Sequence, residues 1–225
     1  MEVTGHRGAP AYAPENTLKS FGLAIKMGVD AIEMDVHLTR DKEVVVIHDP
    51  SVDRTTDGTG MIRDLQLGQI QKLRIAQGEQ VPTLQEVIDL AYGKVTLQIE
   101  LKGEGTETAV AKLIKRYDPN NFFLISFWHS RVLTAKSICP DVKTGVLLEG
   151  LPLNVLDVVD SAKADRLAIK YDTIDKKTVD LLQSHGKTVS AWVVDDPNHI
   201  KGMVSMGIDS ITSNKPDAVL RLLGR

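Results

Sequence analysis

Short apolar, β-branched runs alternate with segments whose apolar residues recur at helical spacing, from one end of the chain to the other. The runs that predict strands are Glu2–His6, Ala31–His37, Val44–His48, Val95–Leu101, Phe122–Phe127, Lys143–Leu148, Arg166–Lys170, Thr188–Val194 and Ser210–Ser213. The segments that predict helices are Thr17–Met27, Leu84–Tyr92, Thr106–Tyr117, Ser130–Ile138, Val155–Ser161, Lys176–Ser184, Pro197–Met206 and Pro216–Leu223. Thr83 and Glu86 form a capping-box pattern, and Gly186 and Gly207 follow two predicted helices, as C-terminal glycines do. This alternation is typical of an α/β protein.

The number of strand–helix units favours a closed barrel. Eight units remain when Val44–His48 is counted as an extension of the loop after the second strand. The strands read as apolar without alternation, which predicts a parallel sheet buried on both faces. Eight units in 225 residues favour a TIM (β/α)8 barrel over an open doubly wound sheet. No glycine-rich phosphate fingerprint of the Rossmann type follows the first strand. We expect residues 1–225 to form one domain.

One long stretch, from Pro50 to Pro82, is rich in Asp, Thr and Gly and shows no clear period. An excursion of this length inside a compact domain is usually a functional lid or a small insertion. We therefore predict a small insertion after strand 2, at about Ser51–Val81.

Composition is that of an ordinary globular protein, with 42% hydrophobic and 25% charged residues. The net charge of −3 gives no broad positive field, which argues against nucleic acid as a main partner. The single Cys139 excludes an internal disulfide framework and suits a reducing compartment. The first residues lack the pattern of a signal peptide, and no apolar stretch approaches the ~18 residues of a membrane span. We expect a cytoplasmic protein without stable membrane insertion; the sequence does not indicate its oligomeric state.

Three carboxylates are predicted at the mouth of this barrel. Glu33 and Asp35 lie two residues apart on the second strand, so their side chains point to the same face, and Glu100 and Lys102 repeat this spacing on the next strand. Carboxylates that converge repel one another unless a cation lies between them. Oxygen ligands favour Mg²⁺ or Ca²⁺, with Mn²⁺ also open. The alternatives are a solvated strand end for Glu33 and Asp35, and a structural ion pair for Glu100 and Lys102.

Two histidines and an arginine are predicted beside these carboxylates. His6 and Arg7 end the first apolar run, and His48 ends the third. Imidazoles move protons and a guanidinium binds an anionic oxygen, so together with a divalent cation they predict metal-assisted cleavage of a phosphate ester. The alternatives are ordinary core or surface histidines and a surface ion pair for Arg7.

Other polar and aromatic residues allow more than one interpretation. Trp192 points inward near the end of its strand and either lines the substrate cavity or fills the barrel. Glu15 and Asn16 precede the first helix, where they cap it or brace His6 or the metal site from outside. The remaining histidines are expected to be ordinary core or surface residues: His37, His129, His185 and His199.

A series of sequence blocks extends over the whole chain. The blocks are Gly5-His6-Arg7-Gly8-Ala9, Ala13-Pro14-Glu15-Asn16-Thr17, Glu33-Met34-Asp35-Val36-His37-Leu38-Thr39-Arg40-Asp41, Val46-Ile47-His48-Asp49, Asp53-Arg54-Thr55-Thr56-Asp57-Gly58-Thr59-Gly60, Val81-Pro82-Thr83-Leu84-Gln85-Glu86, Glu100-Leu101-Lys102, and more loosely Ser126-Phe127, Trp192, Gly207-Ile208-Asp209 and Pro216-Asp217. In order and spacing they resemble the glycerophosphodiester phosphodiesterase family.

The resemblance implies a TIM barrel with a small insertion at about Ser51–Val81 and a divalent metal. It also implies roles for particular side chains: Glu33, Asp35 and Glu100 as metal ligands, His6 and His48 as the general acid/base pair, and Arg7 and Lys102 as phosphate contacts. The chain departs from the family at strand eight, where Thr212-Ser213-Asn214-Lys215 stands in place of the frequent Ile-Thr-Asp. We expect this departure to affect a contact at the rim and not the catalytic set.

The expected reaction is hydrolysis of a small-molecule glycerophosphodiester to glycerol 3-phosphate and an alcohol, with His6 as first base and His48 as first acid. A lysophospholipase D-like or phospholipase C-like activity is the nearest alternative. It needs an apolar rim, whereas Ser51–Val81 is polar apart from a few residues: Met61, Ile62, Leu65 and Leu67. The other alternative is a non-catalytic barrel that binds a phosphate ligand. The presence of both histidines argues against it, since binding alone needs no proton-transfer pair.

Overall fold

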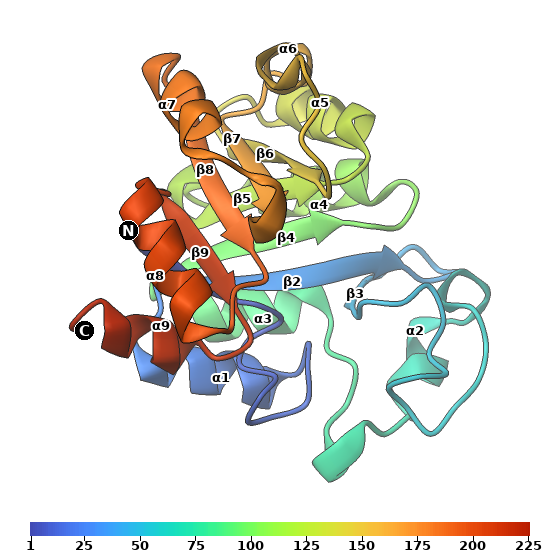
Figure 1. Cartoon of the computed structure of the whole chain (residues 1–225). Coiled ribbons are helices and arrows are strands. Elements are labelled where there is room, and N and C mark those ends of the chain that lie inside the picture. Colours follow the sequence, from blue (N-terminus) through green and yellow to red (C-terminus); the bar gives the residue numbers. More distant parts are fainter.

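Parallel strands close into a barrel in the computed structural model, which describes residues 1–225 (Figure 1). The strands of the barrel, in their order around it, are β1 (Glu2–Gly5), β9 (Ser210–Ser213), β8 (Thr188–Trp192), β7 (Arg166–Lys170), β6 (Lys143–Leu148), β5 (Phe122–Ser126), β4 (Thr96–Leu101) and β2 (Ala31–Leu38). The barrel is closed because β1 pairs in parallel with both β9 and β2. The predicted TIM barrel is confirmed.

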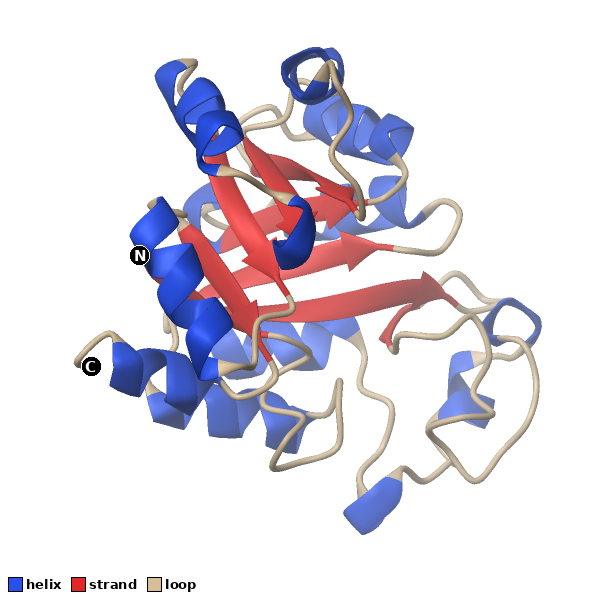
Figure 2. Ribbon diagram, viewed as in Figure 1, coloured by secondary structure: helices blue, strands red, loops and turns tan.

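Helices follow the barrel strands and surround the sheet (Figure 2). They are α1 (Leu18–Met27), α3 (Leu84–Ala91), α4 (Thr106–Ile114), α5 (His129–Ile138), α6 (Val155–Ser161), α7 (Lys176–Ser184), α8 (Pro197–Met206) and α9 (Pro216–Leu222). Thr83 and Glu86 form the predicted capping box before α3, and Gly207 adopts the left-handed conformation after α8. None of the helices combines the length and the apolar character needed to cross a bilayer.

Along barrel strands such as β4, apolar residues that face the helices alternate with polar residues that face the barrel interior, more strictly than the sequence suggested. On β4, Leu97 and Ile99 belong to the large apolar core, which includes buried residues of the helices, whereas Gln98 and Glu100 line the cavity at the barrel mouth. Farther down, the guanidinium of Arg166 is 3.0 Å from a carboxylate oxygen of Glu2. Both faces of the sheet are buried, as predicted, but the inner face carries many polar groups. The barrel interior can therefore accommodate the charged side chains of a reactive site.

The insertion forms a small lobe beside the end of β2, coloured cyan in Figure 1. It begins with β3 (Val44–Val46), which pairs antiparallel with the end of β2 and lies outside the barrel. Short helical turns that the sequence did not reveal follow: η1 (Ile62–Asp64), α2 (Leu67–Ile70) and η2 (Ala76–Gly78). A separate apolar cluster holds the lobe together: Val45, Ile47, Val52, Ile62, Ile70, Ile75 and Val81. The stretch is therefore packed around its own core, although its pattern looked irregular.

Candidate active site

A cavity of about 290 Å³ opens at the carboxyl ends of the barrel strands. Most of its polar lining comes from β1, β2, β4 and the segments beside them and includes His6, Arg7, Glu33, His48, Glu100 and Lys102; Thr212 of β9 and Glu149 after β6 complete it. Its apolar lining comes from β5 to β8 and the loop after β5 and includes Ile125, Phe127, Leu147, Ala168 and Trp192. The predicted catalytic and phosphate-binding side chains and two of the three predicted metal ligands therefore line one cavity, while Asp35 is buried next to it, and a largely apolar wall faces them across the barrel.

The three predicted metal ligands form a buried cluster. Ligand atoms of Glu33, Asp35 and Glu100 all lie within 4.8 Å of one another. Asp35 and Glu100 are register partners on the adjacent strands β2 and β4. Glu33 and Asp35 lie inside β2 rather than at its end, because β2 extends beyond them to pair with β3. The barrel mouth is thus recessed at this point, and the carboxylates are below the rim.

The electrostatics of the cluster are those of an anionic site that lacks a sufficient counter-charge. Burial raises the pKa of Glu33 well above its ordinary value, and the charges of Asp35 and Glu100 raise it further. Burial and the charge of Asp35 likewise raise the pKa of Glu100 to about 7. Burial would also raise the pKa of Asp35, but the positive charges of Lys102 and Arg7 outweigh it and lower that pKa. A divalent cation between these oxygens would remove the repulsion.

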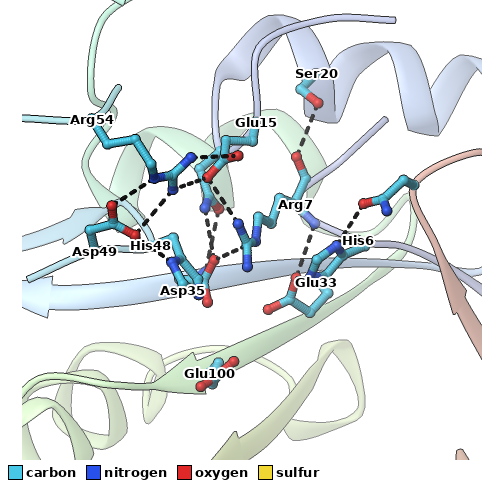
Figure 3. Close-up of polar contacts among 12 residues, drawn as sticks. His6, Arg7, Glu15, Ser20, Glu33, Asp35, His48, Asp49, Arg54 and Glu100 are labelled. Carbon is cyan, nitrogen blue, oxygen red and sulfur yellow. Dashed lines mark hydrogen bonds and ion pairs between the residues drawn. The ribbon is translucent and has the colours of Figure 1, made fainter. Parts of the chain in front are cut away.

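Arg7 sits in a tight turn that joins β1 to the cluster (Figure 3). Its φ is 52° and that of Gly8 is 91°, so the chain reverses direction within these residues. The Arg7 backbone N–H donates to Glu33 Oε2 at 2.9 Å, and the Arg7 carbonyl accepts from Ser20 Oγ at 3.0 Å. Its Nη1 donates to Glu15 Oε1 at 2.9 Å. The turn therefore fixes both a guanidinium and a carboxylate of the site.

Asn16 contacts the carboxylate cluster, one of the positions considered for it. Its Nδ2 donates to Asp35 Oδ2 at 2.8 Å, and its Oδ1 accepts from the Asp35 backbone N–H at 3.3 Å. Glu15 contacts Arg7 and Arg54, and Arg7 in turn lies 3.2 Å from the Asp35 carboxylate, so of the positions considered for Glu15 the contacts favour the metal-site side over His6. The helix cap itself is the neighbouring Thr17.

His6 follows β1 directly instead of ending it. Its Nδ1 is 2.7 Å from Asn214 Oδ1, and its Nε2 is 4.0 Å from Glu33 Oε2. Burial, followed by the charge of Arg7, lowers the pKa of His6, which favours the neutral ring. Asn214 in turn donates from Nδ2 to Asp195 Oδ2 at 2.7 Å. The departure from the family at strand eight was expected to touch only the rim. That expectation is wrong, because Asn214 contacts the predicted catalytic histidine.

His48 is held by a carboxylate and by another histidine. Its Nδ1 is 2.6 Å from Asp49 Oδ1, and its carbonyl oxygen is 3.1 Å from His37 Nε2. Arg54 donates from Nε to Asp49 Oδ2 at 2.6 Å, and this contact is the main reason why the pKa of Asp49 is lowered. Arg54 Nη2 also donates to Glu15 Oε1 at 2.7 Å, so the insertion is connected to the loop before α1 (Figure 3).

These contacts show which residues the sequence reading missed. His37 has the same two-residue spacing as Glu33 and Asp35, and this spacing was a signal that its side chain faces the mouth. Asp49 is adjacent to His48 in the sequence, which was a weaker signal. Asp195 carries no local pattern that distinguishes it from other loop aspartates.

Trp192 lines the cavity, one of the two positions considered for it. Its ring meets that of Phe127 edge to face, with centroids 5.5 Å apart, and it packs against the cluster of Phe123, Ile125, Leu147 and Ala168. Its indole Nε1 is buried without a hydrogen-bond partner in the protein.

The chain is similar to known proteins over nearly its whole length. The enzyme named glycerophosphodiester phosphodiesterase of Caldanaerobacter subterraneus is 34% identical, with 98% of this chain and 97% of that protein covered. An Oleispira antarctica phosphodiesterase, solved in complex with the product sn-glycerol-3-phosphate, superposes with a TM-score of 0.94 at 28% identity, covering 100% of this chain and 97% of that one. Residues 6–218 match the sequence profile of the glycerophosphoryl diester phosphodiesterase family, and the chain belongs to that family.

Proposed function

We propose that this glycerophosphodiester phosphodiesterase hydrolyses its substrate in the cavity described above, with a divalent cation at Glu33, Asp35 and Glu100 and with His6 and His48 as the proton carriers. The observation that carries the proposal is the buried carboxylate cluster beside two imidazoles in one cavity. The products are sn-glycerol 3-phosphate and an alcohol.

The donor set fits a hard divalent cation. It consists of carboxylate oxygens alone, within 4.8 Å of one another, and two of the three groups have a raised pKa because they are buried together. When bound, Mg²⁺ or Ca²⁺ would neutralise charge on the non-bridging oxygens of the phosphate. The identity of the ion, Mg²⁺ or Ca²⁺, stays a prediction. The cytoplasmic location stays a prediction as well.

Arg7 and Lys102 are the proposed phosphate contacts. Both line the cavity, and each already pairs with Asp35, with Arg7 Nε at 3.2 Å and Lys102 Nζ at 3.3 Å from its carboxylate oxygens. Lys102 Nζ also donates to Glu100 at 3.0 Å. Two cations held in this way are preorganised to stabilise negative charge that develops at phosphorus. Trp192 is proposed to contact the carbon chain of the substrate from the apolar side.

The proton transfers balance when the two histidines exchange roles between steps. In the first step the 2-hydroxyl of the glycerol unit attacks phosphorus and gives its proton to His6, while His48 protonates the departing alkoxide oxygen. The intramolecular attack benefits from proximity and forms a cyclic phosphate. In the second step water attacks phosphorus and gives a proton to His48, and His6 returns its proton to the 2-oxygen as that bond to phosphorus breaks.

A lysophospholipase D-like activity is the second candidate, because one observation favours it. The loop after β5 exposes Phe127 and Trp128, by 39% and 61%, at the cavity mouth or next to it. An acyl chain would need apolar surface of this kind. The polar surface of the insertion was expected to exclude such a substrate, but the opposite rim carries these two aromatic residues in addition to the carboxylate of Glu149.

One assay series tests the function and separates the candidates. We expect release of glycerol 3-phosphate from glycerophosphocholine, loss of this activity after dialysis against a chelator, and recovery with Mg²⁺ or Ca²⁺. The Glu100→Gln variant should not recover, whereas Glu104→Gln, which changes a carboxylate outside the cluster, should. Faster release of choline from lysophosphatidylcholine would favour the second candidate. Absence of turnover on either substrate with any of Mg²⁺, Ca²⁺ or Mn²⁺ would overturn the proposed function.

A further inference from the structure

Three loops at neighbouring strands form a chain of hydrogen bonds that ends at His6. His6 follows β1, Asn214 follows β9 and Asp195 follows β8, and these strands are adjacent in the barrel. Asn214 lies between the other two: its Oδ1 is 2.7 Å from His6 Nδ1, and its Nδ2 is 2.7 Å from Asp195 Oδ2. The metal ligands take no part in this chain.

The carboxylate of Asp195 sets the orientation of the Asn214 amide. Its Oδ1 accepts from the Asn214 backbone N–H and from Ser213 Oγ, each at 2.8 Å. The Ser213 oxygen itself accepts from the backbone N–H of Lys215, so its own hydrogen is free to point at Asp195. A carboxylate only accepts, so the group of Asn214 that faces Asp195 must be the NH₂. The amide oxygen therefore faces His6.

An amide oxygen also only accepts, so the hydrogen between Asn214 and His6 must belong to Nδ1 of the imidazole. In the neutral ring the other nitrogen, Nε2, then carries a lone pair. We propose that Asp195, acting through Asn214, holds His6 in the Nδ1–H tautomer and thereby makes its Nε2 the proton acceptor of the first step. The assignment of a base rests on the proposed function, but the tautomer does not.

The two histidines differ in their partners, which supports different roles. Asp49 contacts His48 directly and can stabilise the positive ring of a proton donor. His6 Nδ1 contacts a neutral amide instead, with the Asp195 carboxylate one side chain farther away, and Glu33 lies 4.0 Å from the other ring nitrogen, Nε2. A neutral partner at Nδ1 fixes the ring orientation and does not itself attract a second proton.

The substitution Asp195→Asn tests the relay because it preserves shape and changes only donors and acceptors. An oxygen must remain toward Ser213 and the Asn214 backbone N–H, so the new NH₂ faces the Asn214 NH₂. The Asn214 amide is then expected to flip and to present NH₂ to His6, which moves the ring hydrogen to Nε2. We expect kcat for glycerophosphocholine to fall by ~10²-fold with little change in KM, since the base is blocked.

The double variant Asp195→Asn/Asn214→Asp should reverse this loss. The carboxylate introduced at position 214 accepts both from the new amide and from His6 Nδ1–H, which restores the original tautomer and recovers kcat to within about tenfold of the wild type. A control is Gln183→Ala, which removes another amide–carboxylate contact, at 3.0 Å from Asp209, remote from the cavity. It should leave kcat unchanged.

The tautomer of His6 is measured by ¹⁵N NMR on histidine-labelled protein that contains neither metal nor substrate. The signals that are missing from the spectrum of His6→Gln identify His6. We expect Nδ1–H in the wild type and in the double variant, and Nε2–H in Asp195→Asn. A wild-type ring in the Nε2–H form, or a ring that does not respond to Asp195→Asn, would overturn the relay. The expected tautomers with an inactive wild type would instead overturn the proposed function and leave the relay standing.

Discussion

Arg54 Nε lies 2.6 Å from Asp49 Oδ2, so a residue of the insertion holds the carboxylate that orients His48. The same guanidinium donates to Glu15, which also pairs with Arg7. Ion pairs therefore link the lobe between β3 and α3 to the catalytic cavity, in addition to the covalent backbone. Because the Arg54 side chain is 47% exposed, these ion pairs contribute little to folding stability and act mainly on geometry.

Replacement of Arg54 by Met should therefore lower activity more than stability. Without its partner, the Asp49 carboxylate can turn away from His48, and kcat is expected to fall about 10-fold, as for other supporting residues around a site. The matched control is Arg63→Met, an exposed arginine of the same lobe that pairs with no carboxylate. Steady-state kinetics and thermal unfolding of both variants check this. Equal kcat values for the two variants would contradict it.

The histidine pair makes a separate prediction. His6→Ala and His48→Ala should each lower kcat by ~10²-fold or more, because each removes one of the two proton carriers. His185→Ala, at the end of α7 and outside the cavity, is the control and should keep wild-type turnover. Circular dichroism should show the same fold for all three variants. Near wild-type turnover of both active-site variants would mean that the reaction uses other proton carriers.

The raised carboxyls of the cluster should lower the stability of the metal-free protein as the pH rises from about 5 to 8, whereas His6, whose pKa is lowered, contributes in the opposite sense. Glu100 has a folded-state pKa of about 7, above the ordinary value of a glutamate, and that of Glu33 is raised as well. Between the unfolded and folded values the native state binds more protons than the unfolded state, so the free energy of unfolding decreases with pH. Urea unfolding at several pH values measures this slope.

Two comparisons identify the groups responsible for that slope. Glu100→Gln removes one of the raised carboxyls, so its stability should decline less steeply with pH than that of the wild type. Saturating Mg²⁺ or Ca²⁺ should raise wild-type stability most at high pH, where the ligands are ionised and the cation binds the native state. If wild type and Glu100→Gln follow the same curve, the carboxylate cluster does not control the pH dependence.

The barrel was predictable from the sequence because its signals are local. Apolar runs and helical spacing recur in each unit, and Thr83 with Glu86 marks a helix start within four positions. The carboxylate cluster was predictable because the two-residue spacing of Glu33 and Asp35 sends both side chains to one face. His6 was predictable because it follows the first barrel strand, whereas His48 reaches the cavity from the segment after β3, which lies outside the barrel and ends before it.

Other parts of the site depend on contacts between distant segments, which no local pattern records. Asn214 and His6 are separated by most of the chain and meet only because β9 closes the barrel against β1. Asp195 and Arg54 lie in loops, and loop residues orient their partners through side-chain geometry that the spacing of a sequence does not encode. The insertion was read as irregular because its helical turns are too short to show a period.

The turn that carries Arg7 depends on the absence of a side chain at Gly8. A Cβ at this position would lie 2.4 Å from Ser20 Oγ and 2.6 Å from the Ser20 carbonyl carbon, and the φ of 91° disfavours any other residue. Gly8→Ala must therefore push the turn away from α1. We expect a loss of ~1–3 kcal/mol in the free energy of unfolding.

The activity of Gly8→Ala should fall together with its stability. The same turn directs the Arg7 backbone N–H to Glu33 and the Arg7 guanidinium into the cavity. Gly22→Ala in α1 is the matched control: a Cβ there meets nothing within 4 Å, and the higher helix propensity of alanine should stabilise the protein by about 1 kcal/mol. Its kcat should equal that of the wild type. Urea unfolding and steady-state kinetics compare the two variants, and a Gly8→Ala protein as stable and active as Gly22→Ala would show that the close approach of the turn to α1 is dispensable.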